Sequence, residues 1–458
     1  MNTIPMTTGA PWKHIVRFAL PVLLGSLLQQ LYNTADAIVV GNFSGEASLS
    51  AVGTTGSFTF LFLAIAMGFS AGNGVIVAQH YGARDMAKVR ENASTGILFL
   101  MALGVVFAAL GFAVARPAFS HLVGVPEGYL DLTVQYFRIY ALGLIFQYGY
   151  NIFSSILRAV GDSAATLYFL LIASVLNILL DLLFVAAFHW GVAGAAVATV
   201  IAQAGSFAAA YVYMRRRYPI FRFALSDYRW NPPLIRRTVA IGFPITLHLM
   251  IVSVGLTLIQ RAVNGFGQAM TASFTVGNRI EQYLNLPFNA FQTTLATYTG
   301  QNIGAGKMDR VKLGTRQTMA MSLASTLVIS GAIWLLAQNI IRLFGLSDQA
   351  AAYCLSHLRT VAMVNVILSL YVPLFGVFQG AGHSGFPAIV AALSLSARVV
   401  TTYLFKDSPF LGYRIIWWNG LFGFGLGLVA SWTFYLSGLW QRGVGERDSR
   451  GAEGHLQN

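Results

Sequence analysis

The sequence predicts an all-α polytopic membrane protein whose twelve transmembrane helices form two six-helix repeats with a substrate path between them. Three observations support this fold class. Hydrophobic residues make up 56% of the 458 residues and charged residues only 10%, whereas soluble domains carry roughly 25% charged residues. Apolar runs of about 20 residues recur along the chain and lack the period-two alternation of a membrane β-barrel. Motifs of the first half also recur in the second.

Each apolar run is long enough to cross the hydrocarbon core of a bilayer as a helix. The twelve predicted spans are, in order, about residues 14–40, 52–80, 93–115, 130–157, 164–188, 191–213, 237–263, 269–299, 315–338, 353–379, 385–405 and 415–440. The short polar stretch 406–414 connects the last two spans.

The net charge of +13 follows a topological pattern. Most of the 29 Lys and Arg residues fall in alternate connections, densest in the arginine-rich stretch 214–236. Cytoplasmic loops carry such an excess beside anionic lipid. We therefore expect both termini in the cytoplasm, a basic cytoplasmic linker over 214–236 and a polar cytoplasmic tail over 441–458. The basic residues then contact membrane lipid, and no nucleic acid is expected as a partner.

The two halves of the chain repeat one another. The motif QHYGARDMAKVR at 79–90 aligns without gaps with QNIGAGKMDRVK at 301–312, and RAVGDS at 158–163 matches QGAGHS at 379–384. Two six-helix units of the same orientation are related by an axis along the membrane normal. This pattern predicts an N-terminal lobe over 1–213 and a C-terminal lobe over 237–440. It is more typical of a transporter than of a membrane enzyme.

Three of the 16 acidic residues, Asp36, Asp181 and Glu281, lie inside apolar segments. An ionisable side chain at membrane depth costs at least about 2.5–3.5 kcal/mol on insertion scales and persists mostly where function needs it. For Glu281 the sequence favours a local ion pair with Arg279 over a coupling role. Asp36 and Asp181 are the stronger functional candidates.

Asp36 ends a polar stripe on the first span, because Gln29, Tyr32, Asn33 and Asp36 follow helical spacing. Asn177 lies four residues before Asp181, on the same face of the fifth span.

Both carboxyl groups are expected about 6–10 Å from the same membrane surface, at 1.5 Å per residue. Thr199 of the sixth span lies close enough to that surface to join them. Two carboxyls, an amide and a hydroxyl can hold a proton, because two close buried carboxylates cannot both ionise cheaply. They can also supply oxygen ligands to Na⁺. The residues alone leave both ions open, and the alternative for each Asp is a hydrogen bond to a neighbouring helix.

Other features narrow the function classes. No GxxxxGK[ST] loop occurs, so ATP-driven transport is not indicated, and the single Cys354 excludes an internal disulfide framework. We expect no cofactor apart from H⁺ or Na⁺ as coupling ion, no catalytic residues, and no metal other than possible Na⁺ at Asp36, Asn177, Asp181 and Thr199. Tyr150 and Asn151 of the fourth span are candidates for lining a cavity or for packing.

Several motifs together resemble the multidrug and toxic compound extrusion (MATE) family over about residues 12–405. They are ALPVLLGSLLQQLYNTADAIVVG, GFSAGNGVIVAQHYGARD, SSILRAVGDS and the second-half echo QGAGHSGFP. The resemblance implies two six-helix lobes facing a central cleft that opens alternately inward and outward. It also implies export of lipophilic, often cationic compounds in exchange for H⁺ or Na⁺.

Within the family, the chain is similar to the DNA-damage-inducible-F-like (DinF-like) branch, whose coupling site lies in the N-terminal lobe. That resemblance assigns the coupling site to Asp36, Asn177, Asp181 and Thr199. It assigns the substrate cavity to Gln29, Tyr32 and Asn151. Asn33, on the same polar stripe as Tyr32, and Tyr150, beside Asn151, are further candidates for that cavity. A monomer in a bacterial inner membrane is expected. The alternatives are a lipid-linked precursor flippase, expected to carry a more charged cavity, and a membrane-embedded enzyme.

Overall fold

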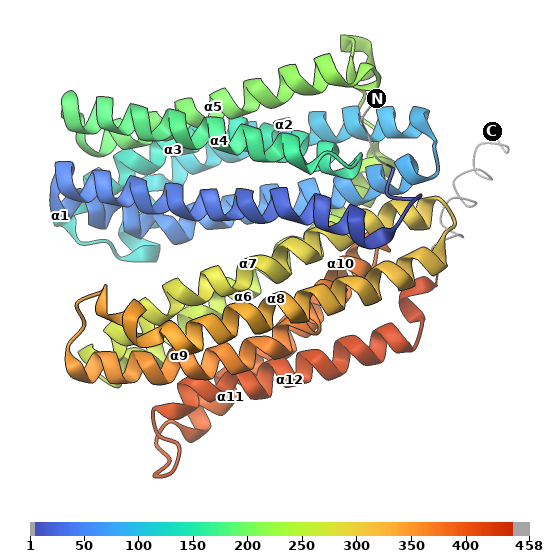
Figure 1. Cartoon of the computed structure of the whole chain (residues 1–458). Helices are drawn as coiled ribbons and strands as arrows, with labels where there is room; N and C mark the ends of the chain where they lie inside the picture. Colours follow the sequence, from blue (N-terminus) through green and yellow to red (C-terminus); the bar gives the residue numbers. More distant parts are fainter. Residues whose placement is uncertain (1–4, 443–458) are drawn as a thin grey trace. The chain divides into compact units, whose positions relative to one another are not determined.

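Long helices make up the first half of the chain in the computed structural model, which describes residues 5–442 (Figure 1). The first, α1 (Pro11–Gly82), is interrupted at Gly45, where φ is 79° and ψ is 175°, so it contains the two spans Pro11–Gly45 and Ser50–Gly82. The others are α2 (Met86–Pro117), α3 (Glu127–Ala159), α4 (Ser163–Asp181) and α5 (Gly191–Arg217), with wider helical turns at Ala118–Val123 after α2 and Leu182–Ala187 after α4.

The second half repeats this order after a linker that contains two short helical turns, Pro219–Phe221 and Leu225–Asp227. Its helices are α6 (Pro232–Asn264), α7 (Gln268–Gly304), α8 (Met308–Arg342), α9 (Asp348–Ser369), α10 (Val372–Gly380), α11 (Gly385–Phe405) and α12 (Arg414–Leu436), followed by the turn Leu439–Gln441. The span predicted over 353–379 is thus divided into α9 and α10.

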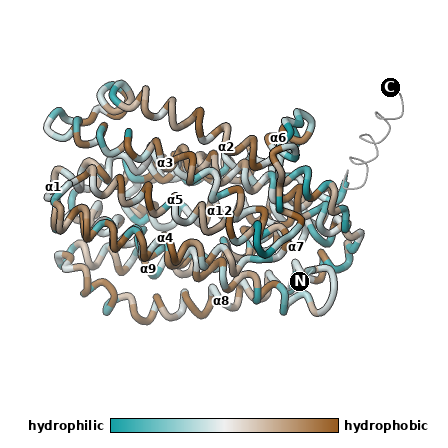
Figure 2. Tube along the Cα trace, turned by 90° about the horizontal axis from the view of Figure 1, so that it is seen from above, coloured by the Kyte–Doolittle hydropathy of each residue, from teal (hydrophilic) through white to brown (hydrophobic). Residues whose placement is uncertain are grey.

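The all-helical membrane fold predicted from the sequence is confirmed. Among the described residues, ten helices are long and apolar enough to cross a membrane. The remaining two spans of the twelve, α3 and α7, are 33 and 37 residues long but carry more polar side chains. Hydrophobic residues follow the helices and hydrophilic residues gather toward their ends and connections (Figure 2).

Equivalent turns of the two halves have the same left-handed backbone, which supports the internal repeat. The matched positions and their φ angles are Gly45 and Gly267 (79° and 92°), Arg84 and Gly306 (61° and 69°), Gly124 and Gly345 (71° and 60°), and Gly161 and Gly382 (93° and 85°). Left-handed backbone favours glycine because a side chain there is strained. Arg84 adopts this conformation where the second half has glycine.

Residue contacts divide the chain into two compact units, here called unit 1 and unit 2. Unit 1 contains Leu20–Thr246, and unit 2 contains Met6–Ala19 together with the described residues from Leu247 onward. These limits differ from the lobes 1–213 and 237–440 expected from the sequence. The beginning of α1 belongs to unit 2, and the beginning of α6 belongs to unit 1. Most of the predicted tail, residues 443–458, lies outside the described residues.

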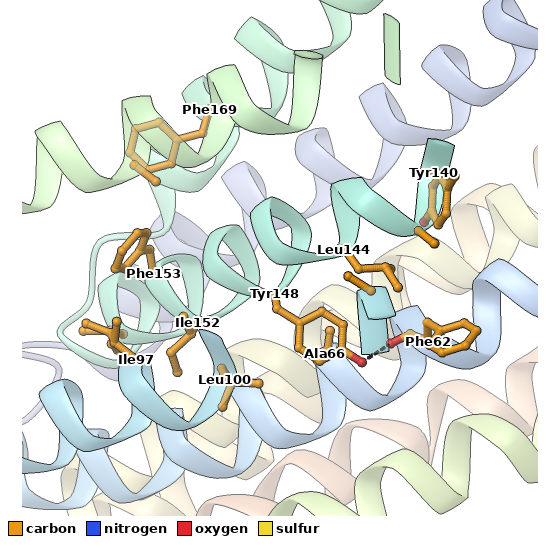
Figure 3. Close-up of a cluster of buried hydrophobic side chains, with 14 of the residues drawn as sticks. Phe62, Ala66, Ile97, Leu100, Tyr140, Leu144, Tyr148, Ile152, Phe153 and Phe169 are labelled. Carbon is orange, nitrogen blue, oxygen red and sulfur yellow. Dashed lines mark hydrogen bonds between the residues drawn. The ribbon is translucent and has the colours of Figure 1, made fainter. Parts of the chain in front are cut away.

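The core of unit 1 is built mainly from α1, α2, α3 and α5. Figure 3 shows aromatic and aliphatic side chains of this core, including Leu100 of α2 and Ile152 of α3. Tyr148 of α3 is fully buried, and its hydroxyl donates to the carbonyl oxygen of Phe62 on α1 at 3.0 Å (Figure 3). The hydrogen bond satisfies the one polar atom of a large apolar side chain.

Glycines allow close helix packing within each unit. In unit 1, a Cβ at Gly72 of α1 would lie 2.7 Å from the carbonyl oxygen of Thr238 and from the amide nitrogen of Gly242 on α6. In unit 2, a Cβ at Gly376 of α10 would overlap the carbonyl oxygen of Gln292 on α7. Small residues at such crossings let backbones approach where the hydrophobic effect contributes little.

Candidate functional site

The structure brings together the two acids that lie inside apolar segments of unit 1, Asp36 and Asp181. Asp36 lies on the first span of α1, and Asp181 is the last residue of α4. Their carboxyl groups are hydrogen-bonded to each other. Asp181 is fully buried, and one oxygen of each carboxyl, Oδ1, has no hydrogen-bond partner among the described residues. The pair therefore has spare oxygen acceptors in a protected position.

Asn177 and Thr199 complete the group that the sequence predicts. The Asn177 amide is oriented so that both of its ends have partners: Nδ2 donates to Oδ2 of Asp181 at 2.7 Å, and Oδ1 accepts from the backbone N–H of Thr199 at 3.2 Å. Both side chains are buried. Asn177 precedes Asp181 by one helical turn, so α4 presents both side chains to α5.

A tyrosine joins this group from α1. The hydroxyls of Tyr32 and Thr199 are hydrogen-bonded. The Thr199 hydroxyl donates its only hydrogen to the carbonyl oxygen of Ala195 at 3.0 Å, so Tyr32 must be the donor in the contact between them. Tyr32 was expected to line the substrate cavity. The structure places it beside the acid pair, four residues before Asp36 on the same helix face.

Two further tyrosines, which the sequence analysis did not single out, face the same group from α3. Tyr136 is within electrostatic range of Asp36, Asp181 and Tyr32. Tyr140 lies one turn later, stacks on Tyr136 with ring centroids 6.4 Å apart, and donates to Oε1 of Gln147 at 3.1 Å. Their four-residue spacing was visible in the sequence. Aromatic residues are so common in membrane helices that this spacing carried no distinctive signal.

The other predicted cavity residues lie elsewhere. Gln29 and Asn33 are exposed on α1. The Asn151 amide donates to the carbonyl oxygen of Gln147 on its own helix at 2.8 Å. Tyr150 is hydrogen-bonded to Ser154, and it is about 20 Å along α3 from Tyr136 at 1.5 Å per residue.

The predicted ion pair between Arg279 and Glu281 is wrong. Residues two apart on a helix point in different directions, and Arg279 is exposed, whereas Glu281 turns inward from α7. Oε2 of Glu281 lies 4.0 Å from Nε2 of His357 on α9, and the Glu281 side chain is 20% exposed. Arg398 of α11 supplies the nearby positive charge.

His357 and Arg398 make Glu281 part of a polar cluster inside unit 2. The His357 ring is nearly parallel to the rings of Phe274, with centroids 5.6 Å apart, and of Trp417, with centroids 4.2 Å apart. Nε of Arg398 donates to Oδ1 of Asn419 at 2.8 Å. In the sequence, each of these residues is a polar group inside an apolar segment. Their contacts could not be predicted, because they lie on four different helices, α7, α9, α11 and α12.

Two arginines at matched repeat positions have packing partners of the same kind. The guanidinium of Arg138 on α3 lies over the ring of Phe112 on α2 at 5.1 Å, and that of Arg359 on α9 lies over Trp334 on α8 at 5.0 Å. A guanidinium over an aromatic face is a favourable cation–π contact. The equivalence supports a structural role for both residues.

The MatE family matches residues 21–183 and 244–404, which include Asp36, Asn177 and Asp181. A relative from Bacillus subtilis (strain 168), "Probable multidrug resistance protein YpnP", is 28% identical over 96% of this chain and 98% of its own length.

Two solved structures are also similar. One, described as an outward-facing conformation of a multidrug resistance MATE family transporter, is 26% identical and has a TM-score of 0.88 over 96% of this chain and 98% of its own. The other, a MOP superfamily transporter from Pyrococcus furiosus, is 25% identical with a TM-score of 0.88 over the same shares. With the family match covering more than half of its residues, this chain belongs to the MatE family and is a membrane transporter rather than an enzyme.

Proposed function

We propose that this protein is a secondary multidrug efflux transporter that exchanges small lipophilic or cationic compounds for protons by alternating access. The contact between the carboxyl groups of Asp36 and Asp181 carries this proposal. Two carboxyl groups hydrogen-bond each other only when one of them holds a proton. The pair is therefore a site where a proton can bind or leave without any other charge being supplied.

Oxygen atoms surround this proton site. Asn177 donates to Asp181, and the Tyr32 and Thr199 hydroxyls bond each other beside it. The same oxygen-rich set could coordinate Na⁺. We favour the proton, because two facing buried carboxyl groups repel each other unless one of them is protonated.

Exchange requires that proton binding and substrate binding favour different conformations. In our mechanism, a proton that enters from outside binds between Asp36 and Asp181, removes one of their two negative charges and causes the first span of α1 to repack. A bound compound is then released outward, and the proton leaves inward. Coupling of this kind is reciprocal, so bound substrate must lower the proton affinity of the pair as much as protons lower the substrate affinity.

The remaining assignments follow from charge and from the relatives. We place the chain in the bacterial inner membrane as a monomer, with both termini cytoplasmic. The basic connections support that orientation, and relatives named as multidrug proteins occur in bacteria. Small lipophilic or cationic compounds are the substrates, and membrane lipid surrounds the helices.

Efflux from proteoliposomes tests the proposal. Purified protein is reconstituted, ethidium is the transported dye, and either a pH gradient alone or a Na⁺ gradient alone is imposed. We expect efflux under the pH gradient only, and background rates for Asp36→Asn and Asp181→Asn. Asp131→Asn is the matched control, because Asp131 pairs with Arg116 on the surface at 3.0 Å and its side chain is 81% exposed.

Two results would count against the proposal in different ways. Efflux driven by the Na⁺ gradient alone would make sodium the coupling ion and leave the site in place. Wild-type efflux rates in both asparagine variants under the pH gradient would show that Asp36 and Asp181 are not the coupling site.

A further inference from the structure

A repeated motif holds the main chain that leads into the first helix. Arg310 lies in the second copy of the motif, at the start of α8. Its guanidinium donates to three carbonyl oxygens of the preceding segment: Nη1 to Gly9 at 2.8 Å, and Nη2 to Met6 at 3.1 Å and to Thr8 at 3.2 Å. The planar fork of donors suits several acceptors in one place.

Other residues at the turn between α7 and α8 form hydrogen bonds with Met6 and Thr7 of the same segment. Nζ of Lys307 donates to the carbonyl oxygen of Thr7 at 2.9 Å. The backbone N–H of Met6 donates to Oε1 of Gln301 at 3.0 Å, and the Asn302 amide donates to the carbonyl oxygen of Met6 at 3.2 Å. Every carbonyl from residue 6 to residue 9 is therefore bonded to this turn, and only main-chain atoms of the segment are used.

The first copy of the motif holds main chain in the same manner. Arg90 on α2 donates to the carbonyl oxygens of Ile220 at 2.6 Å and Arg222 at 2.8 Å, and it pairs with Asp227 at 2.6 Å. Its guanidinium also lies over the ring of Phe223 at 5.2 Å. These partners belong to the linker that leads into α6.

The two arginines occupy different motif positions. Arg310 aligns with Lys88, whose side chain is 50% exposed and forms a 3.7 Å ion pair with Asp85. Arg90 aligns with Lys312, which is exposed. Each copy has thus a single arginine that reaches main-chain carbonyls, placed where the other copy has lysine.

We propose that each copy of the motif is an intramolecular docking site for the main chain that enters the first helix of the opposite repeat. Residues 6–19 belong to unit 2, although α1 continues into unit 1 from Leu20. The turn between α7 and α8 fixes the start of α1 to unit 2. The turn between α1 and α2 fixes the linker before α6 to unit 1. This docking goes beyond the proposed transport activity and does not depend on it.

The docking has a consequence for the helix that carries Asp36. Its beginning is anchored in unit 2, whereas Asp36 contacts Asp181 in unit 1. Repacking of α1 at Asp36 therefore works against a fixed end, not a free one. Because the docking site recognises carbonyl oxygens, side-chain changes at Thr7 or Thr8 that keep the backbone in place leave it intact.

Hydrogen exchange of the full-length protein, read by mass spectrometry, tests the docking. In Arg310→Ala we expect exchange of the peptide covering residues 6–19 to rise at least tenfold, with exchange of residues 219–229 unchanged. Arg90→Ala is expected to do the reverse. Lys88→Ala is the matched control because it changes the aligned position in the first motif, and it should alter neither peptide.

Equal exchange of residues 6–19 in Arg310→Ala and Lys88→Ala would overturn the proposal. If Arg310→Ala fails to yield folded protein, as judged by exchange in α9, the milder Lys307→Ala replaces it. Lys307→Ala removes one of the carbonyl contacts, so a rise confined to residues 6–19 supports the docking, and unchanged exchange there contradicts it. None of these outcomes depends on ethidium efflux.

Discussion

Unit 1 and unit 2 have equivalent turns and equivalent arginine–aromatic contacts. They differ in the groups that surround their buried acidic side chains. In unit 1, Asp36 and Asp181 are hydrogen-bonded to each other. In unit 2, Glu281 lies 4.0 Å from His357 and close to the Arg398 guanidinium. A carboxyl that faces a permanent cation keeps its charge compensated, whereas two facing carboxyls change charge when a proton binds. On our proposal, the acid pair of unit 1 exchanges a proton, whereas Glu281 of unit 2 interacts with the positive charge of Arg398 and is not a coupling site.

The largest expected effect comes from removing the exchangeable proton. Asp181→Asn should reduce pH-driven ethidium efflux to background, because an amide cannot take up or release a proton at this position. Glu281→Gln should retain most of the efflux per folded molecule. Initial rates in proteoliposomes, normalised to reconstituted protein, give the comparison. Equal losses in both variants would mean that the two units do not differ in the way described.

Replacing Glu281 in unit 2 should lower the stability of the protein. Glu281→Gln removes a carboxyl group whose charge interacts with Arg398, and leaving a buried polar group without its partner costs about 1–3 kcal/mol. Arg398 keeps its contacts with Asn419, at 2.8 Å, and with the Phe424 ring, at 4.8 Å, and these contacts limit the destabilisation. Thermal unfolding in detergent should show a lower midpoint for Glu281→Gln than for Asp131→Asn. An unchanged midpoint would mean that Glu281 does not compensate Arg398.

A smaller effect is expected from Tyr32→Phe, which removes the hydroxyl that donates to Thr199. An unmade hydrogen bond at a buried position costs about 1 kcal/mol, so the proton affinity of the site should change by roughly fivefold. The pH at which efflux is half-maximal measures this change. Tyr150→Phe, on α3 and away from the acid pair, is the control. If Tyr150→Phe changes the pH of half-maximal efflux more than Tyr32→Phe does, Tyr32 does not influence proton binding by the acid pair.

The smallest effect concerns the docked linker. The backbone N–H of Ala224 and the Arg90 guanidinium hold the pKa of Asp227 below its ordinary value. A lowered pKa stabilises the docked form above the unfolded value of about 3.9 and loses that stabilisation as the pH falls through the lower folded value. Hydrogen exchange of residues 219–229, corrected for intrinsic rates, should therefore be the same at pH 8 and pH 5. Asp227→Asn should raise it a few-fold at both, and a rise in the wild type between pH 8 and pH 5 would contradict this assignment.

Sequence reasoning found the helices and the acid pair because both have strong physical signals. Apolar runs of membrane length predict the spans, and an acid inside such a run is expensive enough to be noticed. Tyr136 gave no such signal, since a tyrosine in an apolar helix is ordinary. Arg279 and Glu281 were paired by proximity along the chain, although a helix separates residues two apart.

The placement of residues 6–19 in unit 2 could not be predicted either. Hydrophobic periodicity shows that a helix forms but not which bundle packs around its first turns. The self-alignment found the motif that contains Arg310. Its partners are main-chain carbonyl oxygens, and every residue has one, so the sequence carries no mark of the contact.

Proton release on substrate binding tests the central claim most directly. Ethidium is added to purified protein in weakly buffered detergent solution with a pH-indicator dye. If substrate and proton compete through Asp36 and Asp181, the wild type should release about one proton per bound ethidium. Asp36→Asn and Asp181→Asn should release none, and Asp131→Asn should match the wild type. No release from the wild type despite ethidium binding, or equal release from both site variants, would contradict the account.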